Sequence, residues 1–138
     1  MHWSIYALLS AVFAALVAIF GKLGLKDIDS TLATTVRSIV MALFLVGVSI
    51  TFGKFSFLDT LDKKAITFIV FSGVAGALSW LFYFFAIKVG KVSGVVAIDR
   101  TSIVFAVVLA IIFLGEALTW QKAVGAVLVS AGAILIAL

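Results

Sequence analysis

Long apolar stretches alternate with short polar connections along the whole chain. Each apolar stretch approaches the roughly 20 residues that an α-helix needs to cross a bilayer. Transmembrane β-strands would instead alternate apolar and polar residues over about ten positions, whereas stretches such as MALFLVGVSI are apolar on every face. The pattern therefore predicts five membrane-spanning helices, at Trp3–Gly21, Thr31–Phe52, Ala65–Ile87, Val92–Leu114 and Trp120–Leu138.

The composition agrees with a lipid environment. Hydrophobic residues make up 65% of the chain and charged residues 12%, against about 25% charged residues in a soluble domain. A soluble core of this size could not hide so many apolar side chains, because a small globule has too much surface. We expect an all-α, multi-pass protein of the inner cell membrane. It should form a single transmembrane domain over residues 1–138, with no soluble domain and no cleavable signal peptide.

Polar residues and glycines mark the predicted helix ends. Asp29 or Ser30 suits the N-cap of the second helix, and Asp59, with Asp62 three residues later, suits a short turn that opens the third. Thr119 can cap the fifth helix in the same way. Glycines placed where a C-cap glycine is expected follow the third and fourth helices, at Gly90 and Gly115.

Small residues form stripes on three of the helices. The first helix has alanines and a glycine at helical spacing, ending in Ala18 and Gly21, and the fifth helix has a similar stripe that includes Ala133. Small residues let helix backbones approach closely in lipid, so packing alone explains these two stripes. The stripe of the third helix ends at Ser79 and Tyr83, with Trp80 beside it. These three side chains line a cavity or belong to an aromatic belt at the membrane surface, and both interpretations remain open.

Lysines are divided evenly between the two membrane surfaces. If the N-terminus lies on side A, the lysines of side A are Lys54, Lys63, Lys64 and Lys122. The lysines of side B are Lys22, Lys26, Lys88 and Lys91. Orientation follows the imbalance of Lys and Arg between short loops, so this chain is expected to insert in both orientations, unless other signals fix one. Lysine at helix ends also accounts for the net charge of +4 without a nucleic-acid partner.

Three charges lie inside the predicted spans. Arg37 lies about 9 Å from the side B end of its helix, and Asp99 and Arg100 lie about 10 and 12 Å from theirs, at about 1.5 Å per residue. Such residues usually face the bundle interior, pair with one another and mark a transport path. We expect Arg37 to pair with Asp99, while Arg100 extends toward side B or faces a cavity. A purely structural ion pair is the alternative.

The ordered set of these features resembles the EamA domain of the drug/metabolite transporter superfamily. The resemblance rests on TTVRSIVMALFLV in the second helix, GALSWLFYFFAIKVGKVSGVVAIDR across the third and fourth, and FLGEALTWQKAVGAVLVSAGAILIAL at the end. Many members carry two such domains in inverted orientation, so this chain looks like half of a ten-helix inverted-repeat fold. Members often have a proline in the early fourth helix; here that position is Ala97, so no proline kink is expected.

The resemblance implies transport of small organic solutes such as amino acids, metabolites or drugs, usually outward. A homodimer, with an antiparallel dual-topology arrangement, would supply the second half. The resemblance also matches Arg37, Asp99 and Glu116 as polar positions, and Glu116 is interpreted as a structural carboxylate at the surface. The candidate site residues for solute binding or coupling are Arg37, Asp99, Arg100, Ser79, Trp80 and Tyr83.

The motifs and residue types of the chain limit its possible energy sources and classes of activity. The chain has no GxxxxGK[ST] loop, so an ion or solute gradient would have to drive transport. Asp99 is the candidate proton carrier, a role that would fail if Arg37 kept it permanently ionised. The single histidine, His2, and the absence of cysteine leave no catalytic set or metal cluster, so we expect no enzyme, metal or cofactor. A non-transporting membrane subunit, or a chaperone for another integral protein, is the second hypothesis.

Overall fold

A computed structural model describes residues 2–138. The described residues form helices and connections, with no strand among them. The helices are α1 (Trp3–Gly24), α2 (Ser30–Thr51), the 3₁₀-helix η1 (Lys54–Thr60), α3 (Lys63–Val89), α4 (Val92–Asp99), α5 (Ser102–Leu114) and α6 (Trp120–Ala137).

Five segments are long and apolar enough to cross a bilayer: α1, α2, α3, the pair α4–α5 and α6. This confirms the predicted all-α membrane fold with five transmembrane helices. The contacts divide the chain into two compact units, Leu23–Lys88 and Met1–Lys22 with Val89–Leu138, which we describe separately. The single-domain organisation stays a prediction.

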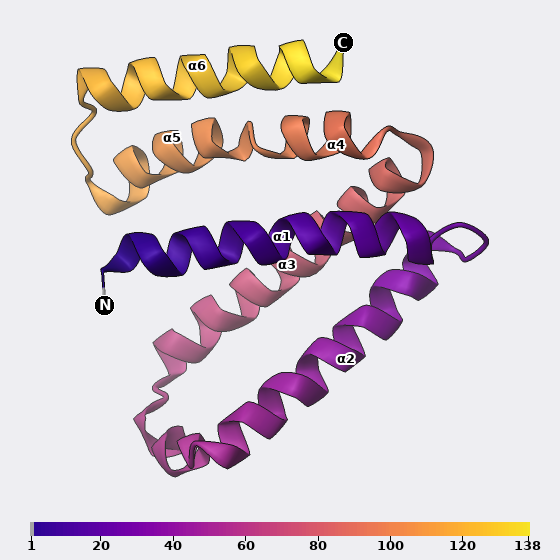
Figure 1. Ribbon diagram of the computed structural model, residues 1–138. Coiled ribbons are helices and arrows are strands. Elements are labelled where there is room, and N and C mark those ends of the chain that lie inside the picture. Colours follow the sequence, from indigo (N-terminus) through magenta and orange to yellow (C-terminus); the bar gives the residue numbers. More distant parts are fainter. Residues whose placement is uncertain (1) are drawn as a thin grey trace. The chain divides into compact units, whose positions relative to one another are not determined.

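The unit Leu23–Lys88 is a helical hairpin of α2 and α3 joined through η1 (Figure 1). Asp29 caps α2, because its side chain accepts the N–H of Leu32 at 3.0 Å. Gly53 then adopts φ 62°, a left-handed conformation that glycine tolerates, and turns the chain from α2 into η1. Its buried side chains lie near the start of α2 and the end of α3, namely Leu25, Ser30, Thr34, Phe84 and Ile87.

The N-cap residue predicted for the third helix, Asp59, was wrong. Asp59 lies inside η1, where Ser56 and Thr60 donate their hydroxyls to the carbonyls of Gly53 and Phe57 at 2.8 and 2.7 Å. These local bonds hold the chain in tight 3₁₀ turns, so α3 starts only afterwards. Its cap is Asp62, whose carboxylate accepts the N–H of Ala65.

The second unit contains most of α1 together with α4, α5 and α6. The start of α1 and the end of α6 lie at opposite ends of this unit (Figure 1). Its buried side chains are all alanine among the described residues, one each in α1, α4 and α6: Ala18, Ala97 and Ala133. The backbone of α4 comes so close to α6 that a Cβ at Gly94 would lie 3.6 Å from Cα of Ala137. Small residues thus permit the close helix packing that the stripe of the last helix predicts.

The two glycines expected at helix C-termini behave differently. Gly115 has φ 67° and ends α5 in the left-handed conformation, as predicted. Gly90 directly follows the end of α3 as predicted, but it does not have the positive φ of a left-handed cap. The chain turns into α4 through the extended backbone of Lys91 instead, and the carbonyl of Gly90 accepts a hydrogen bond from Nζ of Lys22 at 3.0 Å.

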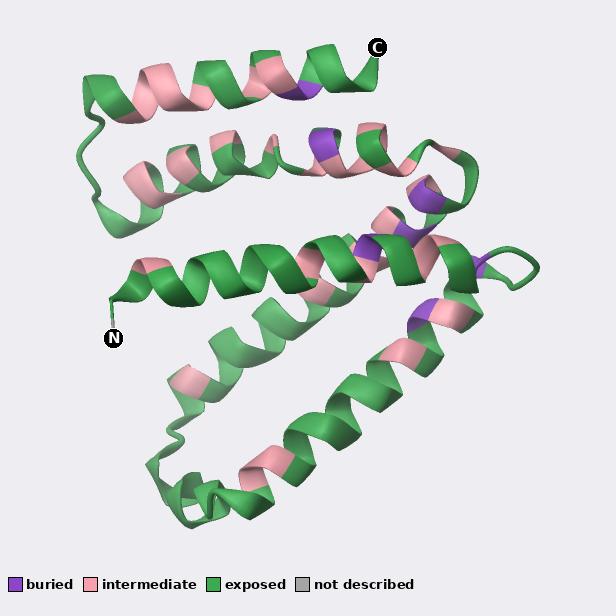
Figure 2. Cartoon of the chain, in the orientation of Figure 1, coloured by how far each residue is buried: buried purple, intermediate pink, exposed green. Residues whose placement is uncertain are grey.

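Large apolar side chains cover the outer surface of the helices. Figure 2 shows that most residues of α1, α2 and α3 are exposed, and these include Phe44 at 70% and Phe71 at 67% exposure. Patches of this kind are rare on soluble monomers. They are suited to contact with lipid or with another apolar helix.

Candidate functional site

Arg37 of α2 lies against a cluster of aromatic rings from α3. Its guanidinium carbon is 3.7 Å from the centroid of the Trp80 ring and 5.6 Å from that of Phe84. The cluster owes its shape to helical spacing, because Trp80, Tyr83 and Phe84 occupy positions i, i+3 and i+4 on one face. A cation over such rings is stabilised by their negative faces, by about 0.5–2 kcal/mol depending on desolvation. We call these four residues the arginine–aromatic cluster.

The rings of the cluster also contact one another. The centroids of Trp80 and Tyr83 are 5.3 Å apart in an edge-to-face arrangement, and those of Trp80 and Phe84 are 6.0 Å apart. Edge-to-face pairs are favoured because the positive edge of one ring meets the negative face of the other. Two of the three sequence candidates on α3, Trp80 and Tyr83, therefore lie beside Arg37, whereas Ser79 is exposed and lies outside the cluster.

Phe84 belongs to the cluster but was not among the predicted site residues. It is 4% exposed and is the most buried of the three aromatic residues. The signal in the sequence was its position four residues after Trp80, which places the two rings on one helix face. Since phenylalanine occurs in four of the five spans, that signal did not stand out.

Two hydroxyls next to Arg37 on α2 are hydrogen-bonded within their own helix. Thr34 donates its hydroxyl to the carbonyl of Ser30 at 2.7 Å, and Ser38 donates to the carbonyl of Thr34 at 2.8 Å. Hydroxyls bonded back to the preceding turn add little polarity to a helix surface in lipid. The guanidinium of Arg37 is thus the main polar group that this part of α2 presents.

The fourth span is interrupted directly after Asp99. α4 ends at Asp99 and α5 starts at Ser102, and the two residues between them form a turn. The amide of Thr101 donates to the carbonyl of Ile98 at 2.9 Å, and the amide of Val104 donates to that of Thr101 at 2.9 Å. These bonds span three residues instead of the four of an α-helix, so the turn is of the 3₁₀ type.

No proline causes this interruption, because the chain contains none. Thr101 supplies a local cause, since its hydroxyl donates to the carbonyl of Ile98 at 2.7 Å. A threonine that bonds back to the preceding turn bends a helix. Asp99 is half-buried and Arg100 is exposed at this turn. Irregular backbone at membrane depth is tolerated where it is buried in protein or lines a water-filled cavity.

Arg37 and Asp99 occupy equivalent depths in their helices. α2 starts at Ser30 and α4 at Val92, so each charge lies about 10 Å along its helix at about 1.5 Å per residue. The two residues belong to the two different units of the chain. Their predicted ion pair therefore stays a prediction.

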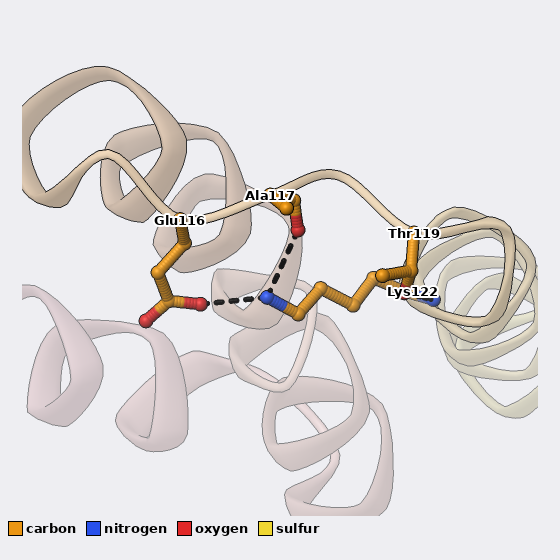
Figure 3. A network of polar contacts seen from close by, with 4 residues as sticks. All are labelled: Glu116, Ala117, Thr119 and Lys122. Carbon is orange, nitrogen blue, oxygen red and sulfur yellow. Dashed lines mark hydrogen bonds and ion pairs between the residues drawn. The ribbon is translucent and has the colours of Figure 1, made fainter.

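A separate ion pair stabilises the connection between α5 and α6. Oε2 of Glu116 lies 2.7 Å from Nζ of Lys122, which also donates to the carbonyl of Ala117 at 3.2 Å (Figure 3). Thr119 accepts the N–H of Lys122 at 3.3 Å, which makes Thr119 the N-cap of α6 as predicted. Both charged side chains are largely exposed, and surface pairs of this kind contribute about 0–1 kcal/mol. Glu116 therefore has a structural role at this turn.

Acidic and metal-binding groups are sparse in the described part of the chain. It holds no group of three or more His, Cys, Asp or Glu residues that could bind a metal ion. At the surface, the N–H of Leu32 holds the pKa of Asp29 below its ordinary value, and the positive charge of Lys88 acts in the same direction.

Comparison with known proteins finds similarity to membrane transporters along the whole chain. The sequence model of the EamA-like transporter family matches residues 1–138. An uncharacterised transporter encoded in the cobO 3′ region of a Sinorhizobium species is 36% identical over 135 residues, which are 98% of this chain and 96% of that protein. An uncharacterised protein of Methanocaldococcus jannaschii is 27% identical over 136 residues, which are 97% of this chain and 95% of its own. No solved structure is significantly similar to the chain. The chain therefore belongs to the EamA-like transporter family and is a multi-pass membrane transporter of the drug/metabolite superfamily.

Proposed function

We propose that the protein is a secondary exporter of small organic solutes in the inner cell membrane, with no enzymatic activity. The observation that carries this proposal is the interruption of the fourth span at Asp99. Discontinuous helices in transporters commonly surround substrate and coupling-ion sites near the middle of the membrane. The family assignment supports the same conclusion.

Asp99 is proposed to carry the coupling proton. It is the only Asp or Glu within the five spans, and embedded carboxylates commonly serve as proton relays. Solute efflux would then be driven by proton entry, with protonation and deprotonation of this one carboxyl group in each cycle.

Reconstitution tests both transport and coupling. Purified protein in liposomes should take up a radiolabelled solute when a proton gradient is imposed, whereas Asp99→Asn should lose this driven uptake and retain solute exchange. Flux by the protein alone would exclude the alternative of a non-transporting subunit. If neither protein moves any solute of a broad amino-acid and organic-ion panel, the transport proposal is wrong; if Asp99→Asn keeps driven uptake, the coupling role is wrong.

The functional unit is proposed to be a homodimer of two oppositely oriented copies. Two observations support it: the lysines divide equally between the surfaces, and the helix faces are extensively apolar. Two copies in opposite orientation would provide the inverted repeats from which many transporters are built.

Cysteine labelling tests the dual orientation, because the chain contains no cysteine. Ser56→Cys, in η1, should react with an impermeant reagent in about half of the molecules in sealed vesicles. Lys26→Gln with Lys91→Gln should favour one orientation, and Lys63→Gln with Lys64→Gln the other. Each fixed variant alone should be inactive, and co-expression should restore transport. If Ser56→Cys, in a protein with all its lysines unaltered, reacts from one face only, the antiparallel dimer is refuted.

A further inference from the structure

We propose that Arg37 binds the carboxylate of the transported solute, so that the substrates are small organic acids or amphoteric molecules with a carboxylate. This inference rests on the proposed transport function for its biological role, but the binding site itself can be tested without transport. It is built on the arginine–aromatic cluster, the charge distribution of its unit and the hydrogen-bonding capacity of guanidinium.

Trp80 lies against the guanidinium, with 3.7 Å between the guanidinium carbon and the ring centroid. We infer that the guanidinium group stacks flat on the ring. Its N–H groups point outward in the plane of the group. The ring stabilises the positive charge at one face of the guanidinium and leaves the in-plane N–H donors available to bind a ligand. A flat, held guanidinium matches a planar carboxylate through two parallel hydrogen bonds.

The unit that contains Arg37 offers it no carboxylate at its depth. The acidic residues of Leu23–Lys88 all lie in the connections outside α2 and α3: Asp27, Asp29, Asp59 and Asp62. Asp29 and Asp62 already accept backbone N–H groups as helix caps. A charge at this depth is costly without a counter-ion. The counter-ion therefore has to come from outside this unit.

A solute carboxylate would satisfy that requirement, and so would Asp99 if it forms the predicted ion pair with Arg37. Because both would present the same chemistry to Arg37, they would compete for it. Removing the Asp99 charge should consequently strengthen solute binding, an effect that a purely structural role of Arg37 would not produce.

The chain allows a direct binding measurement because it has three tryptophans. Trp3→Phe with Trp120→Phe leaves Trp80 as the only tryptophan, and a ligand at Arg37 should alter its fluorescence. We would titrate purified protein in detergent with cyclohexanecarboxylate, cyclohexanecarboxamide and cyclohexylmethylamine, which differ mainly in charge. Saturable binding of the carboxylate at least tenfold tighter than that of the other two is expected. Equal or tighter binding of the amide or the amine would overturn the proposal.

Variants of the cluster give the matched controls. Arg37→Lys keeps the charge but lacks the planar fork, so carboxylate affinity should fall about tenfold, whereas Asp99→Asn should raise it several-fold. Arg37→Gln should lose the preference for carboxylate over amide, with folding checked by its thermal unfolding midpoint. Should that variant fail to fold, Arg37→Lys decides the matter, because an unchanged affinity there would also contradict a planar-fork site.

A phosphate group, free or in a lipid headgroup, is the competing oxyanion. Inorganic phosphate should not displace cyclohexanecarboxylate at equal concentration, and the affinity should be the same in detergent and in phosphatidylcholine vesicles. Displacement by phosphate, or loss of binding in those vesicles, would overturn the carboxylate assignment. Carboxylate binding without flux in liposomes would refute transport and keep the site, whereas flux of amines without carboxylate binding would refute the site and keep transport.

Discussion

The hairpin α2–α3 and the interrupted span α4–α5 place charges in the membrane by different means. In the hairpin, the helix that carries Arg37 is continuous, and neighbouring side chains stabilise the charge: the ring of Trp80 lies 3.7 Å from the guanidinium carbon. In the span α4–α5, the backbone itself changes at Asp99, where 3₁₀ bonds interrupt the helix. A cation can be stabilised by ring faces, but rings repel a carboxylate. The anion therefore lies at irregular backbone.

We infer that this difference also separates a rigid region from a hinge. Ring contacts hold Arg37 on a continuous helix, whereas a mid-helix 3₁₀ turn often marks a functional hinge. We infer that the hairpin orients the solute and that the turn at Asp99 moves. Four predictions, the third with a comparison variant on α2, test or refine this comparison, from the largest expected effect to the smallest.

The largest effect is expected from removing one of the two embedded charges. Arg37→Gln and Asp99→Asn should each lower the free energy of unfolding by about 3–5 kcal/mol, because each would leave a buried charge uncompensated. The double variant should recover most of that loss in a detergent unfolding titration. Arg100→Gln serves as the control and should be milder, since Arg100 is exposed. If the double variant is as unstable as the sum of the single variants, the two charges do not pair.

The close approach of α4 to α6 should tolerate no large side chain. Gly94→Leu is expected to cost about 1–3 kcal/mol by overpacking, whereas Gly94→Ala should be nearly neutral because its Cβ would lie at an ordinary contact distance, 3.6 Å from Ala137. Gly132→Leu is the matched control on α6, since a side chain there would enter open space. Thermal unfolding in detergent measures all three. Similar losses at Gly94 and Gly132 would contradict the packing.

The turn after Asp99 should straighten when Thr101 loses its hydroxyl. Thr101→Ala removes the hydrogen bond to the carbonyl of Ile98, worth about 1 kcal/mol. The distribution of distances between spin labels at Ser93→Cys and Val108→Cys should shift and narrow, and transport should fall severalfold. Thr101→Ser keeps a hydroxyl and should behave as the wild type. An unchanged distance distribution in Thr101→Ala would mean that another contact causes the interruption.

The same substitution on α2 gives a comparison between the two regions. Thr35 donates its hydroxyl to the carbonyl of Thr31 at 2.9 Å within a continuous helix. Thr35→Ala should leave label distances across α2 unchanged. If α2 responds as α4–α5 does, the distinction between a rigid hairpin and a hinge is lost.

The smallest effect is expected at the cap of α2, where Asp29 is exposed at the surface. Its folded-state pKa is lowered by the N–H of Leu32 and by Lys88. Its contribution to stability is therefore present above the ordinary carboxyl pKa and is lost as the pH falls through the lowered value. Unfolding measured across this acidic range should show a small decrease that Asp29→Asn removes, because asparagine caps without titrating. An identical acid profile in both proteins would exclude this contribution.

The amino-acid sequence by itself determined the five spans and part of their ends. The length of the apolar stretches, the cap residues Asp29 and Thr119 and the glycine at Gly115 act within a few residues of where they stand. In lipid no water is present to bond the backbone N–H and C=O groups. An apolar stretch of this length therefore forms a helix, in which these groups hydrogen-bond to one another. The cap at Asp62 was missed because local bonds continue η1 past Asp59. The carbonyl of Gly90 instead bonds to Lys22, far away in the sequence.

Only the tertiary structure decided how the charges are held. The sequence showed that Arg37 and Trp80 lie in different helices, but their contact depends on how two distant segments pack. It also gave no proline to predict the turn after Asp99, where the hydroxyl of Thr101 bonds to the carbonyl of Ile98. Span formation follows from the large, summed transfer of many apolar residues into lipid. The stacking of one ring and the bending of one helix depend on individual contacts, each worth about 1 kcal/mol, which only the folded chain can select.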